Sequence, residues 1–198
     1  MSSTQRYTKV AIILHWLIAF AIIAMFALGW YMGELPKDGP KQTAFDLFDL
    51  GLYTWQMDEP ASARTLYFNL HKSLGFSLLW LILFRVYWRI SHTPPAMLAS
   101  YSALERKVAT GAHHLLYLLM VAMPVSGVLM TLYSKFGLKW FGVEVFGGLD
   151  NADLRDLFKE SHELFANILL VIFIVHVVGA LKHRFIDKDE TMSRMSLK

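Results

Sequence analysis

The chain contains no cysteine among its 198 residues, and this absence excludes several kinds of redox site. Disulfides, iron–sulfur clusters held by thiolates and covalently attached c-type haem all require cysteine. Histidine and methionine remain as the soft or borderline metal ligands, with eight and ten copies respectively. Any metal in this protein is therefore expected to be bound by these two residue types.

Charge is also scarce, because only 18% of the residues are charged while 55% are apolar. Soluble domains carry about a quarter charged residues. Four mostly apolar segments are each long enough to cross a hydrocarbon core of about 30 Å as a helix. We therefore predict one all-α domain over residues 1–198, an integral membrane four-helix bundle. Its helices are expected at about 10–31, 67–88, 111–133 and 162–181, with long outer loops at 32–66 and 134–161.

The basic residues gather on one side of the predicted membrane. The N-terminus, the loop 89–110 with Arg85, and the C-terminal tail together carry a net charge of +7, whereas the other side carries −4. Because cytoplasmic segments are enriched in Lys and Arg, both termini are predicted to be cytoplasmic. The first apolar run is too long for a signal peptide and leads to no small-residue cleavage site, so we expect it to be retained.

Four histidines fall at matching depths in the predicted helices. His162 and His176 are 14 residues apart, which is about 21 Å along one helix face. His71 opens the second helix at the level of His162, and His15 lies about two turns into the first helix, at the level of His176. Ionisable residues inside spans are rare and usually functional. We therefore predict two pairs, His71 with His162 and His15 with His176, which could hold cofactors between facing helices.

Two features bear on this pairing. His113 and His114 also lie near the inner level, so either of them could replace His15 as the partner of His176. A haem porphyrin bound by a histidine lies roughly along the helix, so the next turn of that helix must be thin. Each paired histidine is followed one turn later by a small residue that leaves this room, whereas His113 and His114 are not. These small residues are Ala19, Gly75, Ala166 and Ala180.

Arg85 repeats the 14-residue spacing after His71 and so reaches the inner level. An arginine fork is a common partner for carboxylates, and a haem carries two propionates. Arg85 is therefore a candidate propionate ligand. The alternative is an arginine that extends from the helix end toward water.

Several motifs, taken together, resemble the prokaryotic cytochrome b561 family along nearly the whole chain. They comprise His15-Trp16, the run His71-Lys72-Ser73-Leu74-Gly75, Arg85 to Arg89 with Pro94-Pro95, the set His113, Tyr117, Pro124 and Gly127, Ser161-His162-Glu163, and His176 with the run from Ala180 to Asp189. The resemblance implies two haem b groups bound by the same four histidines, in a multi-pass protein of the bacterial inner membrane.

The resemblance also implies electron exchange with quinone, ubiquinone being the expected substrate, near the inner haem. Lys182 and His183 are candidate quinone ligands, although this basic patch could serve only membrane orientation. The outer donor or acceptor is expected to be superoxide, as in the superoxide oxidases of the family, or a periplasmic redox protein. Lys72, Lys135 and Lys139 on the outer side could attract an anion such as superoxide. The protein is therefore expected to be either a superoxide:quinone oxidoreductase or an electron-transfer protein.

The first outer loop is longer than in the superoxide-oxidising form of the family. It contains an apolar and acidic stretch, Phe45–Trp55, that could lie on the membrane surface or recruit a protein. Two rival functions are a membrane anchor that passes electrons to a peripheral enzyme and a histidine-based proton or metal transporter. A nucleic-acid role has no support.

Overall fold

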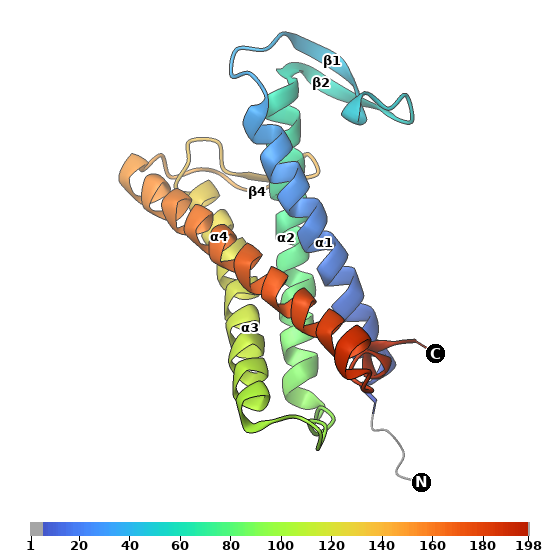
Figure 1. Ribbon diagram of the computed structural model, residues 1–198. Coiled ribbons are helices and arrows are strands. Elements are labelled where there is room, and N and C mark those ends of the chain that lie inside the picture. The colour runs from blue at the N-terminus through green and yellow to red at the C-terminus, as the bar shows by residue number, and fades with distance from the viewer. Residues whose placement is uncertain (1–5, 198) are drawn as a thin grey trace.

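The computed structural model describes residues 6–197, which are dominated by four long helices (Figure 1). Each helix contains an apolar window long enough to cross a membrane. The protein is therefore a mostly helical, multi-pass membrane protein. Residues 1–5, part of the N-terminal segment predicted to be cytoplasmic, and residue 198 lie outside the described residues. The helices are α1 (Lys9–Glu34), α2 (Ala63–Ser91), α3 (Ala103–Leu132) and α4 (Ala152–Lys182).

Each helix begins at a polar residue whose side chain accepts a hydrogen bond from a backbone amide of the first turn. Ser102 and Glu105 form a reciprocal capping box at the start of α3. The other three caps are Thr8, Ser62 and Asn151. α2, α3 and α4 therefore begin before the apolar segments predicted from the sequence, because polar turns continue the helix out to its cap.

The helices pack in chain order, α1 on α2, α2 on α3 and α3 on α4. α4 is tilted and crosses the bundle, and its backbone approaches α1 and α2 less closely than these three pairs (Figure 1). A buried apolar cluster that includes Ile18, Ile82, Leu119 and Leu169 lies in the middle of the bundle. Leu169 stands seven residues from both His162 and His176, so the core separates the two histidine levels.

The outward faces of the helices are largely apolar. Phe20 is 63% exposed on α1, and Val171 and Val178 are each 58% exposed on α4. Exposed apolar surface of this extent is unusual for a soluble monomer. It suits helices that are surrounded by lipid.

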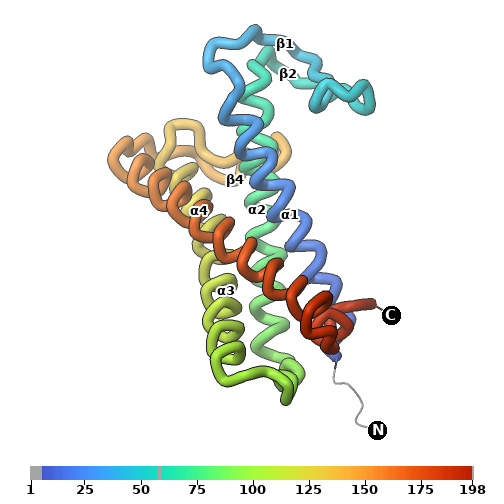
Figure 2. The backbone as a smooth tube through the Cα atoms, in the orientation of Figure 1, coloured from blue at the N-terminus to red at the C-terminus, as the bar shows by residue number. Residues whose placement is uncertain are grey.

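Two antiparallel hairpins occupy the outer segments, where the sequence analysis predicted only loops. β1 (Lys41–Asp46) pairs with β2 (Thr54–Ser62), and β3 (Leu138–Trp140) pairs with β4 (Val143–Phe146). Both lie toward the end of the bundle opposite the start of α1 and the end of α4 (Figure 2). The all-α prediction therefore describes the bundle but not these segments, which a bulge and short strands make hard to recognise in the sequence.

Candidate cofactor site

Two histidines face each other near the outer end of the bundle. The ring centres of His71 on α2 and His162 on α4 are 6.4 Å apart, and the ring planes make an angle of 78°. Two imidazoles that bind one metal ion from opposite sides have centres about 6 Å apart, because each metal–nitrogen bond is about 2 Å long. The distance between the ring centres of His71 and His162 therefore suits a single iron bound by both rings.

The ring of His162 is oriented by α3. Its Nδ1 lies 2.9 Å from the carbonyl oxygen of Met123 and 3.1 Å from Oγ of Ser126. An Nδ1–H group that donates to the carbonyl leaves the lone pair of Nε2 available for a metal, a common arrangement for metal-binding histidines. Met123 and Ser126 were not predicted as site residues, because contacts between helices are not visible in sequence spacing.

Glycines on two neighbouring helices leave room for the outer rings. A Cβ atom at Gly127 would lie 3.0 Å from Cε1 of His162, and one at Gly29 would lie 3.7 Å from Cε1 of His71. Within residues 6–197, the buried Nδ1 of His71 has no hydrogen-bond partner. A buried polar atom left unpaired is destabilising by about 1–3 kcal/mol. The glycines thus let the two rings pack closely against α1 and α3, and the unpaired nitrogen fits a site that takes up a further polar group.

The second histidine pair lies toward the inner end. The ring centres of His15 on α1 and His176 on α4 are 6.1 Å apart, close to the separation in the outer pair. The ring of His113 also approaches that of His176, at 5.5 Å. His15 and His176 are half-buried, whereas His113 and His114 are exposed. His15 and His113 therefore both belong to the inner cluster around His176.

Arg85 contacts the inner pair directly. Its Nη2 lies 3.2 Å from Nδ1 of His15, and its guanidinium carbon lies 5.6 Å from the centre of the Tyr117 ring. A guanidinium group can only donate, so Nδ1 of His15 accepts and the ring proton resides on Nε2. Binding of a metal at Nε2 would move that proton to Nδ1 and release Arg85 toward another acceptor.

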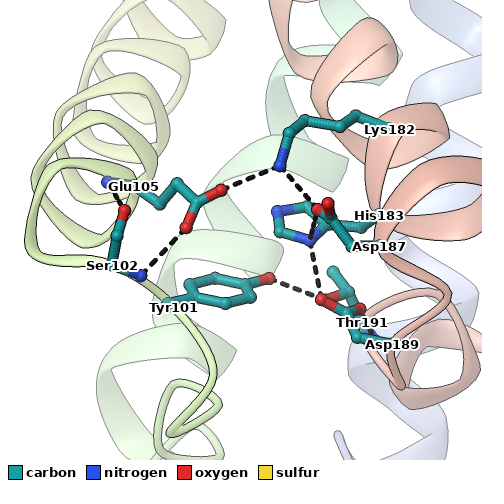
Figure 3. A network of polar contacts seen from close by, with 8 residues as sticks. All are labelled: Tyr101, Ser102, Glu105, Lys182, His183, Asp187, Asp189 and Thr191. Carbon is teal, nitrogen blue, oxygen red and sulfur yellow. Dashed lines mark hydrogen bonds and ion pairs between the residues drawn. The ribbon is translucent and has the colours of Figure 1, made fainter.

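Lys182 and His183, the predicted quinone ligands, lie in a polar network at the inner corner of the bundle (Figure 3). Lys182 Nζ donates to Glu105 at 2.8 Å and to Asp187 at 2.6 Å. His183 Nδ1 donates to Asp189 at 2.7 Å, and Asp187 Oδ2 lies 3.1 Å from the same nitrogen. A π-helical turn over His183–Asp187 brings these groups together at the end of α4.

The network also fixes the C-terminal tail against the segment that leads into α3. The ring of Tyr101 stacks on that of His183 with centres 4.6 Å apart, and its hydroxyl lies 2.7 Å from that of Thr191. Burial by itself would raise the pKa of Asp189, but hydrogen bonds from Thr191 and His183 outweigh it and hold that pKa below its ordinary value. Both quinone candidates are thus already paired with carboxylates.

A cavity of about 450 Å³ lies between the tail and α1. The indole Nε1 of Trp16, the residue after His15, donates to the carbonyl of Met195 at 2.9 Å. The lining combines aromatic, thioether and cationic groups from Trp16, Met192, Met195, Arg6 and Arg184. The lining therefore offers both apolar surface and positive charge.

The fold defines a class, the multi-pass membrane proteins built on a helical bundle, and pairs of histidines face each other inside it. The family model described as prokaryotic cytochrome b561 matches residues 6–197. The chain belongs to this family, as its motifs indicated, and it is thereby a b-type haem protein of membrane electron transfer.

Curated relatives agree with this placement over nearly their whole length. The chain is 34% identical to cytochrome b561 homolog 2 of Escherichia coli (strain K12) over 200 residues, which cover 98% of this chain and 93% of the relative. It is 26% identical over 194 residues to the probable superoxide oxidase CybB of Yersinia pestis, covering 96% of each chain. It is also 27% identical over 195 residues to cytochrome b562 of Cereibacter sphaeroides, covering 98% of each.

Proposed function

We propose that the protein is a dihaem cytochrome that carries electrons across the bacterial inner membrane, between ubiquinone near the cytoplasmic side and a donor or acceptor on the outer side. The observation that carries the proposal is the pair of ring separations, 6.4 Å and 6.1 Å, at two levels of one bundle. The basic inner segments orient both termini toward the cytoplasm.

His71 and His162 would bind the outer haem, and His15 and His176 the inner one. Each haem would supply a one-electron ferric–ferrous couple. Because two histidine side chains would bind each iron, neither iron would have an open position for oxygen or peroxide. The protein's own role would be to hold the rings, to exclude water from the core and to set the local charge.

Arg85 would bind a propionate of the inner haem. Its present partner, Nδ1 of His15, becomes a donor once Nε2 binds iron, so the guanidinium then needs a new acceptor. A carboxylate is the acceptor that it binds most strongly. The buried Nε of Arg85, which has no partner among residues 6–197, supports the same assignment.

The inner corner would bind and protonate ubiquinone. The cavity beside Trp16 offers apolar surface and cationic groups, and Arg184 in its lining directly follows Lys182 and His183. Since Nδ1 of His183 is held by carboxylates, Nε2 is the position at which this ring would exchange a proton. Lys182 and His183 would thus supply protons that quinone takes up on reduction.

On the outer side, superoxide is the proposed electron donor. Two superoxide anions would each lose one electron and become O₂, and these two electrons with two protons would convert ubiquinone to ubiquinol. Lys72 and Lys139 lie close enough for their charges to interact, and they would attract the anion together with Lys135. The relative named as a probable superoxide oxidase supports this choice.

The proposal is tested by spectroscopy on the purified protein followed by turnover in liposomes. We expect sharp low-spin haem b bands in the reduced-minus-oxidised spectrum and oxidation of these haems when a ubiquinone analogue is added. Superoxide should then drive quinol formation. A colourless protein would contradict the proposal and favour the histidine transporter, and a stoichiometric peripheral partner would favour the membrane anchor.

A further inference from the structure

The turn of the β1–β2 hairpin has an unusual backbone that α2 helps to fix. Phe48 and Asp49 have φ values of 59° and 53°, which side chains other than glycine rarely adopt. The amide of Phe48 donates a 2.7 Å hydrogen bond to the hydroxyl of Tyr67, and Asp46 accepts one of 2.7 Å from the amide of Gly51. Backbone strain of this kind persists only where the surroundings hold it, and it gathers at functional sites.

Phe48 connects the surface of this turn to the outer histidine pair. Its ring centre lies 5.1 Å from that of Tyr67 and 5.5 Å from that of Tyr31. Tyr67 is only 3% exposed, and it lies one helical turn before His71, on the same face of α2. An exposed ring therefore leads through a buried one to the outer site.

Large apolar side chains gather on the turn, which we call the hairpin tip (Phe48, Leu50, Leu52 and Tyr53). Their exposed fractions are 43%, 61%, 83% and 61%. The tip lies at the outer end of the protein, away from the other hairpin (Figure 2). Exposed apolar surface on a rigid turn is typical of an interaction site.

The surroundings of the tip are acidic. Residues 34–62 contain six carboxylates and two lysines, and Glu34, Asp38, Asp49 and Glu59 are exposed. This charge repels anionic lipid headgroups but attracts a cationic protein surface. A small apolar centre with a charged rim also matches the modest interfaces of transient electron-transfer complexes.

We infer that the hairpin tip is the docking surface of a soluble redox protein whose lysine-rich face surrounds an exposed cofactor edge. The inference rests on the proposed electron-transfer function and adds a protein partner for the outer side beside superoxide. One electron passes in each encounter, so one protein loses what the other gains, and no bond or proton moves.

The test measures binding of a lysine-rich soluble cytochrome c, used as the probe, to the haem-loaded protein in nanodiscs. We expect the affinity to fall as salt rises, because exposed charges are screened. The double variant Asp49→Lys/Glu59→Lys should weaken binding at low salt by tenfold or more. Its matched control, Glu144→Lys/Glu160→Lys, changes the outer charge equally at other exposed positions and should stay within twofold of the wild type.

A second measurement determines whether the hairpin tip contacts water or lipid in the absence of the probe. The chain has no cysteine, so Leu52→Cys provides a single position for an environment-sensitive dye. We expect emission typical of water in nanodiscs alone and a blue shift when the probe is added. A blue-shifted emission without the probe would mean that the tip lies in lipid, and it would overturn the inference.

The inferred docking surface would also be overturned if the hairpin variant bound cytochrome c with unchanged affinity, or if the control variant lost as much affinity. Haem content is measured on the same samples, so a failure of the docking surface can be distinguished from a failure of the proposed dihaem function. Two haems with unaltered probe binding would refute only the docking surface, whereas missing haem would refute the proposed function itself.

Discussion

Replacing Gly127 by alanine should weaken the outer haem site and leave the inner one intact. The new Cβ would lie 3.0 Å from Cε1 and 3.3 Å from Nδ1 of His162. Carbon atoms in favourable contact are about 3.5–4 Å apart, so the ring or α3 must move by about half an ångström. Either movement disturbs the 2.9 Å hydrogen bond between Nδ1 and the carbonyl of Met123.

The size of the effect follows from that bond. An ordinary hydrogen bond contributes about 0.5–1.5 kcal/mol, and loss of the group that orients a metal-binding histidine typically weakens metal binding by about 10–100-fold. Alanine favours a helix over glycine by about 1 kcal/mol, which opposes any loss of helix stability. We therefore expect haem affinity to fall at one site while helix content is unchanged.

The assay follows transfer of haem from the variant to an excess of a haem-scavenging protein. In Gly127→Ala, half of the haem should leave about 10–100 times faster than in the wild type, and the other half at the wild-type rate. Gly111→Ala is the matched control on α3, because a Cβ there meets no atom within 4 Å. Identical kinetics in the two variants would refute the proposed role of Gly127.

Three further predictions concern other parts of the site. Arg85→Gln should lower the midpoint potential of the inner haem, since a nearby positive charge is lost, and Arg85→Lys should lie closer to the wild type in a redox titration. The lowered pKa of Asp189 stabilises the docked tail above the ordinary carboxyl pKa, and this contribution disappears as the pH falls below about 4. Proteolysis of the tail should therefore increase over that range in the wild type, and a similar pH step in Asp189→Asn would contradict this. Tyr67→Phe removes the acceptor of the Phe48 amide, so hydrogen exchange in the hairpin turn should increase, whereas Tyr53→Phe at an exposed position should leave it unchanged.

The arrangement of the histidines could be predicted because it depends on one helix and on the thickness of a bilayer. The 14-residue spacing of His162 and His176 determines two levels, and the order of the apolar segments places His71 at the outer level and His15 at the inner one, with His113 and His114 nearby. The structure brings each of these pairs to within about 6 Å between ring centres.

Other features depend on contacts that sequence spacing does not reveal. The space that Gly127 leaves for His162, and the bond from that ring to the backbone of α3, arise only when α3 and α4 pack together. β2 contains Pro60 and two acidic residues, Asp58 and Glu59, and lacks regular alternation, so the hairpin resembled a loop. The pairing of Lys182 with Glu105 likewise joins the end of α4 to the start of α3.

The central claim is that four named histidines hold two haems, and the haem-to-protein ratio of single variants tests it most directly. A pyridine haemochrome assay should give two haem b per chain for the wild type and one for each of His15→Ala, His71→Ala, His162→Ala and His176→Ala. His113→Ala, His114→Ala and His183→Ala should keep two. Two haems in His15→Ala with one in His113→Ala would move the inner ligand to α3, and no haem in the wild type would contradict the whole account.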